Sequence, residues 1–264
     1  MNITEAQTQQ LQAHCAEAFE LWYRADPDLG TQTYHVADAT VFLWPGLPIP
    51  LFNRAIGLGD EHDPDDAEID RVLDIYREAG IEGYIQLSPL ADREALGRRL
   101  EERGLEQRPS YATLALTPDR WQPATHDPAI TIEPVDGQNR DDFVRVLLEA
   151  FELPSPVDRF LLAAMGLPEV QNFLVRYDGE PAGTGQIVTA ARVGGLYSGG
   201  VLERFRRRGI QAALIDYRAR VAFDQGLQLL YSGTEEVDNQ SSRNLRKRGF
   251  FIAYELFDWA VPTR

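Results

Sequence analysis

Four arginines and a glycine stand together in a short turn ahead of an apolar run with helical spacing. They are Arg204, Arg206, Arg207, Arg208 and Gly209. The first turn of a helix exposes backbone N–H groups that have no partner inside the helix, and the helix dipole adds partial positive charge there. Arginines crowded at this end are unfavourable unless an anion compensates them. The turn therefore predicts a binding site for a phosphate group.

The elements on either side must hold this turn in place. Residues 196–202 are predicted to form a strand that leads into it. The following helix carries apolar residues at intervals of four, three and four, namely Ile210, Leu214, Tyr217 and Val221. Gly226 is predicted to end this helix, and the apolar run 227–231 to form the next strand.

The spacing Arg206-x-x-Gly209-x-Gln211 after a strand resembles the pyrophosphate loop of the GCN5-related N-acetyltransferases, Gln/Arg-x-x-Gly-x-Gly/Ala. Arg206 and Gly209 match the pattern and Gln211 departs from it. A strand, a polar bend, a short helix and the run Arg248-Gly249-Phe250 follow in the family's order. The resemblance implies acetyl-CoA as cofactor, bound through Arg206, Arg207, Arg208, Gly209, Ile210 and Gln211. A basic surface turn before an ordinary helix is the alternative.

The resemblance also implies where the thioester lies. Its oxyanion would be stabilised by backbone N–H groups of Gly200, Val201 and Leu202. Gly199 and Gly200 could permit a bulge that splays this strand from the next and opens a slot for the pantetheine arm. Asn239 and Ser241 match positions from which the family reaches the pantetheine, and helix capping is the alternative for both.

The proton-transfer groups are less sharply indicated. Glu235 and Glu236 follow the predicted strand 227–231, and either could draw a proton from an amine through water; a solvated surface pair is the alternative. Tyr197 and Tyr254 are further acid or base candidates, or packing residues. The family often supplies its acid from a tyrosine four residues before the Gly-Phe pair, where this chain has Leu245. A thiol pKa near 8.5 still makes thiolate a tolerable leaving group.

Composition places the chain among globular proteins and narrows its partners. Of its 264 residues, 44% are hydrophobic and 25% charged, and the net charge is −15. A balance this acidic argues against nucleic acid. Residues 1–130 carry a net −13 and the remainder only −2, so an anionic cofactor fits the second half. The acidic half favours a cationic small-molecule amine as acceptor, if it lines the acceptor cleft.

Several other site types find no support. The chain has one lysine and therefore no Walker loop, and its four histidines show no metal-ligand spacing. The single cysteine, Cys15, fits a reducing compartment. No basic-then-apolar leader and no membrane-length apolar run is present, so we expect a cytoplasmic protein that contacts no membrane. The oligomeric state is not indicated.

The element pattern predicts an α/β (α+β) protein of two tandem acetyltransferase-like domains, each a mixed, mostly antiparallel sheet flanked by helices. Residues 1–117 would be a degenerate domain, 118–129 a linker rich in proline, and 130–264 the acetyl-CoA-binding domain. A faint repeat supports this, because the run from Leu100 to Leu105 parallels that from Leu245 to Phe250.

The first half also contains a decoy. Residues 54–59 fit the loop pattern better than the second half does. An acidic run, 60–66, follows and would repel a pyrophosphate, so we expect a strand there and no coenzyme A. The chain is thus predicted to be an acetyl-CoA-dependent N-acetyltransferase. The alternative is a non-catalytic acyl-CoA-binding module, allowed by the missing tyrosine.

Overall fold

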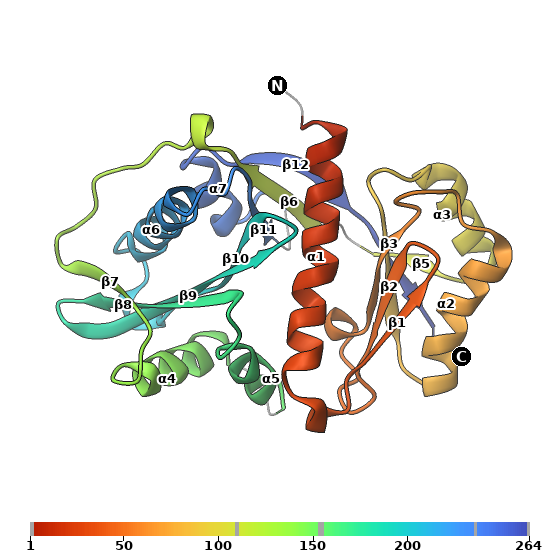
Figure 1. The fold of residues 1–264 in the computed structure, drawn as a ribbon, viewed down its shortest axis with the longest axis horizontal. Coiled ribbons are helices and arrows are strands. Elements are labelled where there is room, and N and C mark those ends of the chain that lie inside the picture. Colours follow the sequence, from red (N-terminus) through yellow and green to blue (C-terminus); the bar gives the residue numbers. More distant parts are fainter. Residues whose placement is uncertain (1–2, 109–110, 153–155, 235–236, 263–264) are drawn as a thin grey trace. The chain divides into compact units, whose positions relative to one another are not determined.

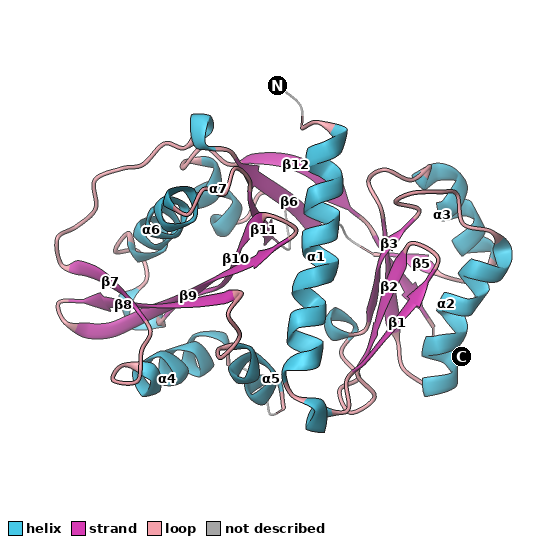
Figure 2. Ribbon diagram, in the orientation of Figure 1, coloured by secondary structure: helices cyan, strands magenta, loops and turns pink. Residues whose placement is uncertain are grey.

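The computed structural model describes residues 3–108, 111–152, 156–234 and 237–262 (Figure 1). The chain forms two mixed sheets flanked by helices, which confirms the predicted α/β class (Figure 2). It divides into two compact units, Met1–Thr113 with Ala253–Arg264, and Leu114–Ile252. Below, these are the first and the second unit.

The first unit holds a six-stranded sheet of order β1-β2-β3-β4-β13-β5. Its elements are α1 (Glu5–Ala25), β1 (Gln32–Val36), β2 (Ala39–Leu43), β3 (Arg54–Leu58), α2 (Asp66–Ala79), β4 (Gly83–Leu87), α3 (Arg93–Glu102), β5 (Glu106–Gln107) and β13 (Asp258–Val261). The decoy segment 54–59 is largely β3, as predicted.

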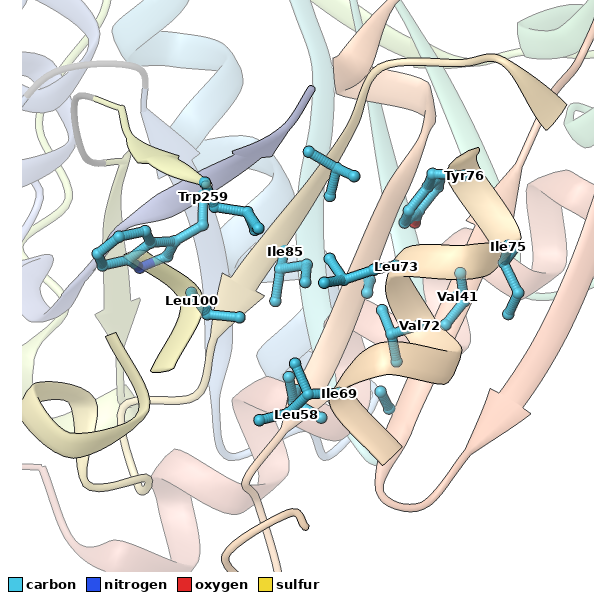
Figure 3. Packing of buried hydrophobic residues seen from close by; sticks show 14 of the residues in the cluster. Val41, Leu58, Ile69, Val72, Leu73, Ile75, Tyr76, Ile85, Leu100 and Trp259 are labelled. Atoms are coloured by element: carbon cyan, nitrogen blue, oxygen red, sulfur yellow. The ribbon is translucent and has the colours of Figure 1, made fainter. Parts of the chain in front are cut away.

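Helix α2 shows how the sequence specifies this unit. A capping box between Asp65 and Glu68 starts the helix, and Gly80, with φ of 66°, ends it in a left-handed cap. Four apolar side chains at helical spacing then face the sheet and form the centre of the core (Figure 3): Ile69, Val72, Leu73 and Tyr76.

The second unit is built on a seven-stranded sheet of order β12-β6-β11-β10-β9-β8-β7. Its elements are β6 (Tyr111–Leu116), β7 (Ile130–Pro134), α4 (Arg140–Phe151), α5 (Val157–Ala164), β8 (Val170–Tyr177), β9 (Glu180–Ala190), β10 (Val193–Val201), α6 (Ile210–Asp224), β11 (Leu230–Thr234), α7 (Gln240–Arg246) and β12 (Phe251–Leu256). Helix α6 lies on one face of this sheet and α4 with α5 on the other (Figure 1).

The two sheets exchange strands. Strand β6 lies between β11 and β12, although it follows β5 in the chain, and β13 lies between β4 and β5, although it follows β12. Each sheet therefore takes its penultimate strand from the end of the other half. The compact units consequently do not coincide with the contiguous ranges 1–117 and 130–264, which describe the chain order but not the sheets.

The internal repeat has a structural counterpart. Leu105 N donates to Leu100 O at 3.1 Å, and Phe250 N donates to Leu245 O at 3.3 Å. Gly104 and Gly249 both have positive φ, 83° and 93°. The two helices α3 and α7 thus end in the same hydrogen-bonded turn before strands in matching sheet positions, as expected of tandem domains.

Two local predictions were wrong. The strand expected at 227–231 begins only at Leu230, because Leu227 N still donates to Ala222 O in the turn that ends α6. The buried face of α6 is also rotated, since Arg218 and Ala222 are buried, whereas Tyr217 and Val221 are only half-buried.

Candidate functional site

Strands β10 and β11 diverge beside the arginine-rich turn. They pair in parallel at two positions only, Gly194 with Leu230 and Gly195 with Tyr231. Strand β10 continues along β9 to Val201, with a shift of register after Tyr197. The bulge expected around the glycine pair is therefore present, and it leaves a slot between β10 and β11.

Buried polar side chains hold the bulge. Ser198 has φ of 51°, and its Oγ donates to Gln186 Oε1 at 2.6 Å. Thr184 Oγ1 donates to the Ser198 carbonyl at 3.2 Å, and Gln186 Nε2 donates to Asn172 Oδ1 at 2.7 Å. Thr184 and Gln186 are fully buried. They replace ladder hydrogen bonds that the bulge removes, a role that the sequence pattern did not reveal.

A cavity of about 680 Å³, the loop cavity, opens beside the turn and is lined by Arg206, Arg207, Gly209, Ile210 and Gln211, and by Gly200 and Val201. Gly209, with φ of 79°, is the N-cap of α6 and supplies no side-chain cap. The first N–H groups of this helix therefore point at an open, arginine-lined space, an arrangement suited to an anion.

The structure separates the arginines. Arg206 and Arg207 line the loop cavity. Arg208 does not, because its guanidinium lies over the Tyr177 ring, 4.8 Å from the centroid. Arg204 instead pairs with Glu149 at 2.7 Å. Arg204 and Arg208 thus have partners other than the loop cavity, and the cofactor contact of Arg208 stays a prediction.

The remaining predicted contacts lie across the cavity on α7. Gln211 Nε2 donates to Ser241 Oγ at 3.3 Å, and Asn244 Nδ2 donates to Gln211 Oε1. Asn239 caps α7 by accepting from Ser242 N at 2.8 Å and also lines the cavity. Gln211, the departure from the family pattern, therefore ties α6 to α7.

A second cavity of about 270 Å³ continues from the first beneath α6. We call it the Arg218 cavity, because the Arg218 side chain forms part of its wall. Both cavities share the residues Phe151, Gly199, Gln211 and Ser241. Arg218 and Phe151 do not stand out in the sequence; the available signal was an arginine one turn after Leu214 on the buried side of a helix.

No group of three metal-ligating side chains occurs in the described ranges. Within the same ranges, no helix has the length and apolar character needed to cross a bilayer.

Comparison with known proteins agrees with this geometry. Residues 140–250 match the family model of the acetyltransferase (GNAT) family. The chain therefore carries a GNAT acetyltransferase domain over these residues. A comparison with curated proteins finds no match.

Solved structures show the same fold over nearly the whole chain. A GCN5-related N-acetyltransferase from Kribbella flavida is 17% identical with a TM-score of 0.66, over 94% of this chain and 95% of that one. One from Sphaerobacter thermophilus has the same identity and TM-score, over 100% and 95%. A tandem GNAT protein from the clavulanic acid biosynthesis pathway is 12% identical with a TM-score of 0.59, over 86% and 78%. The tandem GNAT fold is therefore shown.

Within this GNAT domain, the three backbone N–H groups predicted to stabilise the oxyanion differ in whether they are free of the sheet. Leu202 N donates to Ala182 O at 3.0 Å and is committed to the sheet. Because N–H directions alternate along a strand, the Val201 N–H points away from β9, towards the slot, and the Gly200 N–H points back to β9. Of the three predicted oxyanion donors, the geometry favours Val201.

The predicted acid and base groups are scattered. Glu235 and Glu236 lie outside the described residues. Tyr197 lines the Arg218 cavity, with its ring 5.8 Å from that of Tyr231. Tyr254 lies in the end of β12 that belongs to the first unit; it is 8% exposed, accepts from Gln12 Nε2 at 2.8 Å and has its pKa raised by burial. It lines neither cavity, so Tyr197 is the candidate that the geometry retains.

Proposed function

We propose that this GNAT protein is an N-acetyltransferase that uses acetyl-CoA and a primary amine of a small molecule. Acyl transfer as a general activity follows from the family. The observation that supports coenzyme A is the continuous space from the uncapped start of α6, through the β10–β11 slot, into the Arg218 cavity. The arginines at the α6 end of this space and the strand backbone that edges the slot suit a phosphorylated carrier with an amide-containing arm.

The residues present fit such a cofactor. Arg206, Arg207 and the backbone N–H groups after Gly209 would hold the pyrophosphate. The Val201 N–H would hold a carbonyl in the slot. Bound acetyl-CoA supplies the acetyl group as a thioester.

The protein's part in the reaction is positioning and proton transfer. A backbone donor such as the Val201 N–H strengthens its hydrogen bond as negative charge develops on the carbonyl oxygen that it holds. The amine must lose a proton, for which Tyr197, Glu235 and Glu236 remain our candidates. Leu245, 2% exposed, packs where the family often has its tyrosine, so the thiolate would leave without a dedicated acid from that position.

We infer that the first unit holds no cofactor. Strands β3 and β4 stay paired at four positions, with no divergence comparable to that of β10 and β11. The start of α2 is occupied by its own carboxylates, because Asp65 accepts from Glu68 N and Glu68 accepts from Asp65 N. An incoming phosphate would meet repulsion there.

The cationic acceptor expected from the net charge stays a prediction. Much of the acidic run is used within the first unit: Asp66 pairs with Arg99 and Arg103, each at 2.9 Å, and Asp70 pairs with Arg103 at 2.7 Å. The single cysteine, buried in α1, is consistent with the cytoplasmic location that we propose.

The test of the cofactor site is Gly209→Asp, with Gly209→Asn as its matched control. A Cβ at this position meets no atom within 4 Å, and Asn and Asp both tolerate the positive φ. Only Asp adds a negative charge beside the phosphate. Calorimetry should give one equivalent of acetyl-CoA per wild-type chain, and an affinity at least tenfold lower for Gly209→Asp than for Gly209→Asn, about 1.4 kcal/mol. Equal affinities of the two folded variants would refute the site.

The alternative, a non-catalytic acyl-CoA-binding module, is favoured by Leu245 in place of a tyrosine. Release of free thiol from acetyl-CoA with a panel of amines separates the two. Binding without thiol release from any amine would support the module.

A further inference from the structure

Arg218 is a cation buried inside the second unit. It lies on α6, and only 3% of its surface is exposed. Its Nε donates to Leu214 O at 3.3 Å, and its Nη1 donates to Gln186 O at 3.1 Å and to Tyr197 O at 3.0 Å. These contacts fix the guanidinium in one orientation against the bulge of β10.

The hydrogen bonds of Arg218 do not involve its terminal nitrogen Nη2. All three contacts come from Nε and Nη1, and the described residues provide no hydrogen bond to the two N–H groups of Nη2. Nη2 is also not completely buried. It has no hydrogen-bond partner among the described residues, yet it is not one of the fully buried side-chain atoms without a partner, so part of its surface is accessible. Since Arg218 lines the cavity, Nη2 faces that space.

Among the residues that the structure describes, Arg218 also has no counter-ion. Its partners are all neutral carbonyls, and no carboxylate occurs among the described residues that line the Arg218 cavity. Burial lowers the pKa of the guanidinium to about 9, which leaves it a cation at neutral pH. A buried charge without a partner of opposite sign is costly. The hydrogen bonds from Nε and Nη1 are explained by their role in holding the bulge. A neutral hydrogen-bond donor could fill that role, so the bulge does not explain why the side chain is charged.

The position of Nη2 relates it to the proposed cofactor. A Cβ at Gly199 would lie 3.2 Å from Nη2, so the glycine leaves the guanidinium accessible from β10. Gly199 lines both cavities. A ligand that starts at Gly209 and follows β10 past Val201 therefore arrives at Arg218 with the end that carries the transferred group.

We propose that Arg218 binds a carboxylate of a substrate at the inner end of the slot between β10 and β11. A carboxylate would accept a hydrogen bond from Nη2 and neutralise the buried charge. The inference rests on the proposed acyl transfer and names a substrate class for it. The carboxylate belongs either to the acyl group of the donor, as in a dicarboxylic acyl-CoA, or to the acceptor, as in an amino acid.

The donor arm of the test compares succinyl-CoA with butyryl-CoA, which have acyl chains of four carbons and differ in the terminal carboxylate. Calorimetry on the wild-type chain should show succinyl-CoA binding at least tenfold more tightly. This preference should fall to less than threefold in Arg218→Gln.

The acceptor arm compares L-amino acids with their carboxamides, using acetyl-CoA as donor and following free thiol. A carboxylate on the acceptor predicts a KM at least tenfold lower for the acid than for its amide. Arg218→Gln should raise the KM of the acid alone, whereas a purely structural role would change both acceptors alike.

Arg220→Gln is the matched control, because Arg220 lies on the same helix but is exposed, with its guanidinium over the Tyr217 ring. It should keep the wild-type preference. Arg218→Lys, which keeps the charge, should retain part of it. If neither Arg218 variant folds, the wild-type preference between matched ligands decides alone.

A preference in either arm that is lost in Arg218→Gln supports the proposal and identifies the source of the carboxylate, whereas a preference that persists in folded Arg218→Gln would overturn it. Coenzyme A binding with no preference in either arm would overturn the proposal and leave the proposed function intact. Failure of acetyl-CoA, succinyl-CoA and butyryl-CoA to bind would overturn both.

Discussion

Gly200 lets the end of α4 lie directly against β10. A Cβ at this position would approach Phe151 Cε2 to 2.7 Å and the Ala150 Cβ to 2.9 Å. Such distances force a backbone or side-chain shift, and α4 would have to move away from the strand that edges the slot. The glycine therefore determines how closely α4 approaches β10 beside the loop cavity, in addition to permitting the bulge.

We expect Gly200→Ala to lower the free energy of unfolding by about 1–3 kcal/mol, and to weaken acetyl-CoA binding more than that loss alone implies. Urea denaturation and calorimetry measure the two effects. Gly166→Ala is the control, because nothing lies within 4 Å of a Cβ there. A Gly200→Ala protein as stable as Gly166→Ala would contradict the close approach.

At the residue scale, the sequence predicted what depends on local spacing. Gly209 and Arg206 could be identified because a helix start dictates the local backbone. The sequence could not show which arginines line the loop cavity, because the position of Arg208 over the Tyr177 and Phe205 rings depends on tertiary contacts. Arg218 was missed because helical periodicity assigns a charged residue to the solvent face, and here a long-range network buries it.

At the scale of elements, α6 carries a second buried charge that fastens the proline-rich segment to it. Asp216 accepts from Trp121 Nε1 at 3.1 Å and from Ala124 N at 3.1 Å, and it contacts His126 Nε2 at 2.7 Å. Arg248 Nε lies 3.6 Å away. The segment predicted as a linker is thus held along the helix that begins at the arginine-rich turn.

Asp216→Asn should lower the free energy of unfolding by about 3 kcal/mol, because it removes a buried charge from several donors at once. It should also speed protease cleavage within residues 117–129. Asp224→Asn, at an exposed position of the same helix, should change neither. Unaltered cleavage in Asp216→Asn would show that the segment is held by other contacts.

Strand β3 and helix α6 were predictable from the local residue pattern. The errors lie within α6 and directly after it. The run 227–231 is apolar enough for a strand, but Gly226, with φ of 86°, turns the chain so that Leu227 packs beneath Gly194 before β11 begins. Apolar character alone does not distinguish a leucine that packs in a turn from one that lies in a strand.

At the scale of the whole molecule, the tandem arrangement was predictable and the strand exchange was not. Residues 111–116 and 258–261 are short apolar segments, and nothing within such a segment specifies the sheet that it joins. The exchange depends on the edges that the other strands leave open. Trp259 and Val261 are buried in the first sheet, although they end the second half of the sequence.

The exchange predicts that the two halves fold together and not apart. A fragment of residues 130–264 lacks β6, so β11 and β12 lose the strand between them, and Trp259 loses its core. A fragment of residues 1–129 lacks β13, so β4 loses a neighbouring strand along four residue pairs. Each fragment alone should therefore be aggregated or lack a cooperative unfolding transition, whereas co-expression should yield a soluble complex that binds acetyl-CoA. Gel filtration and thermal denaturation measure this. If residues 130–264 alone unfold cooperatively and bind acetyl-CoA with the affinity of the full chain, the exchanged strands are not needed for either sheet.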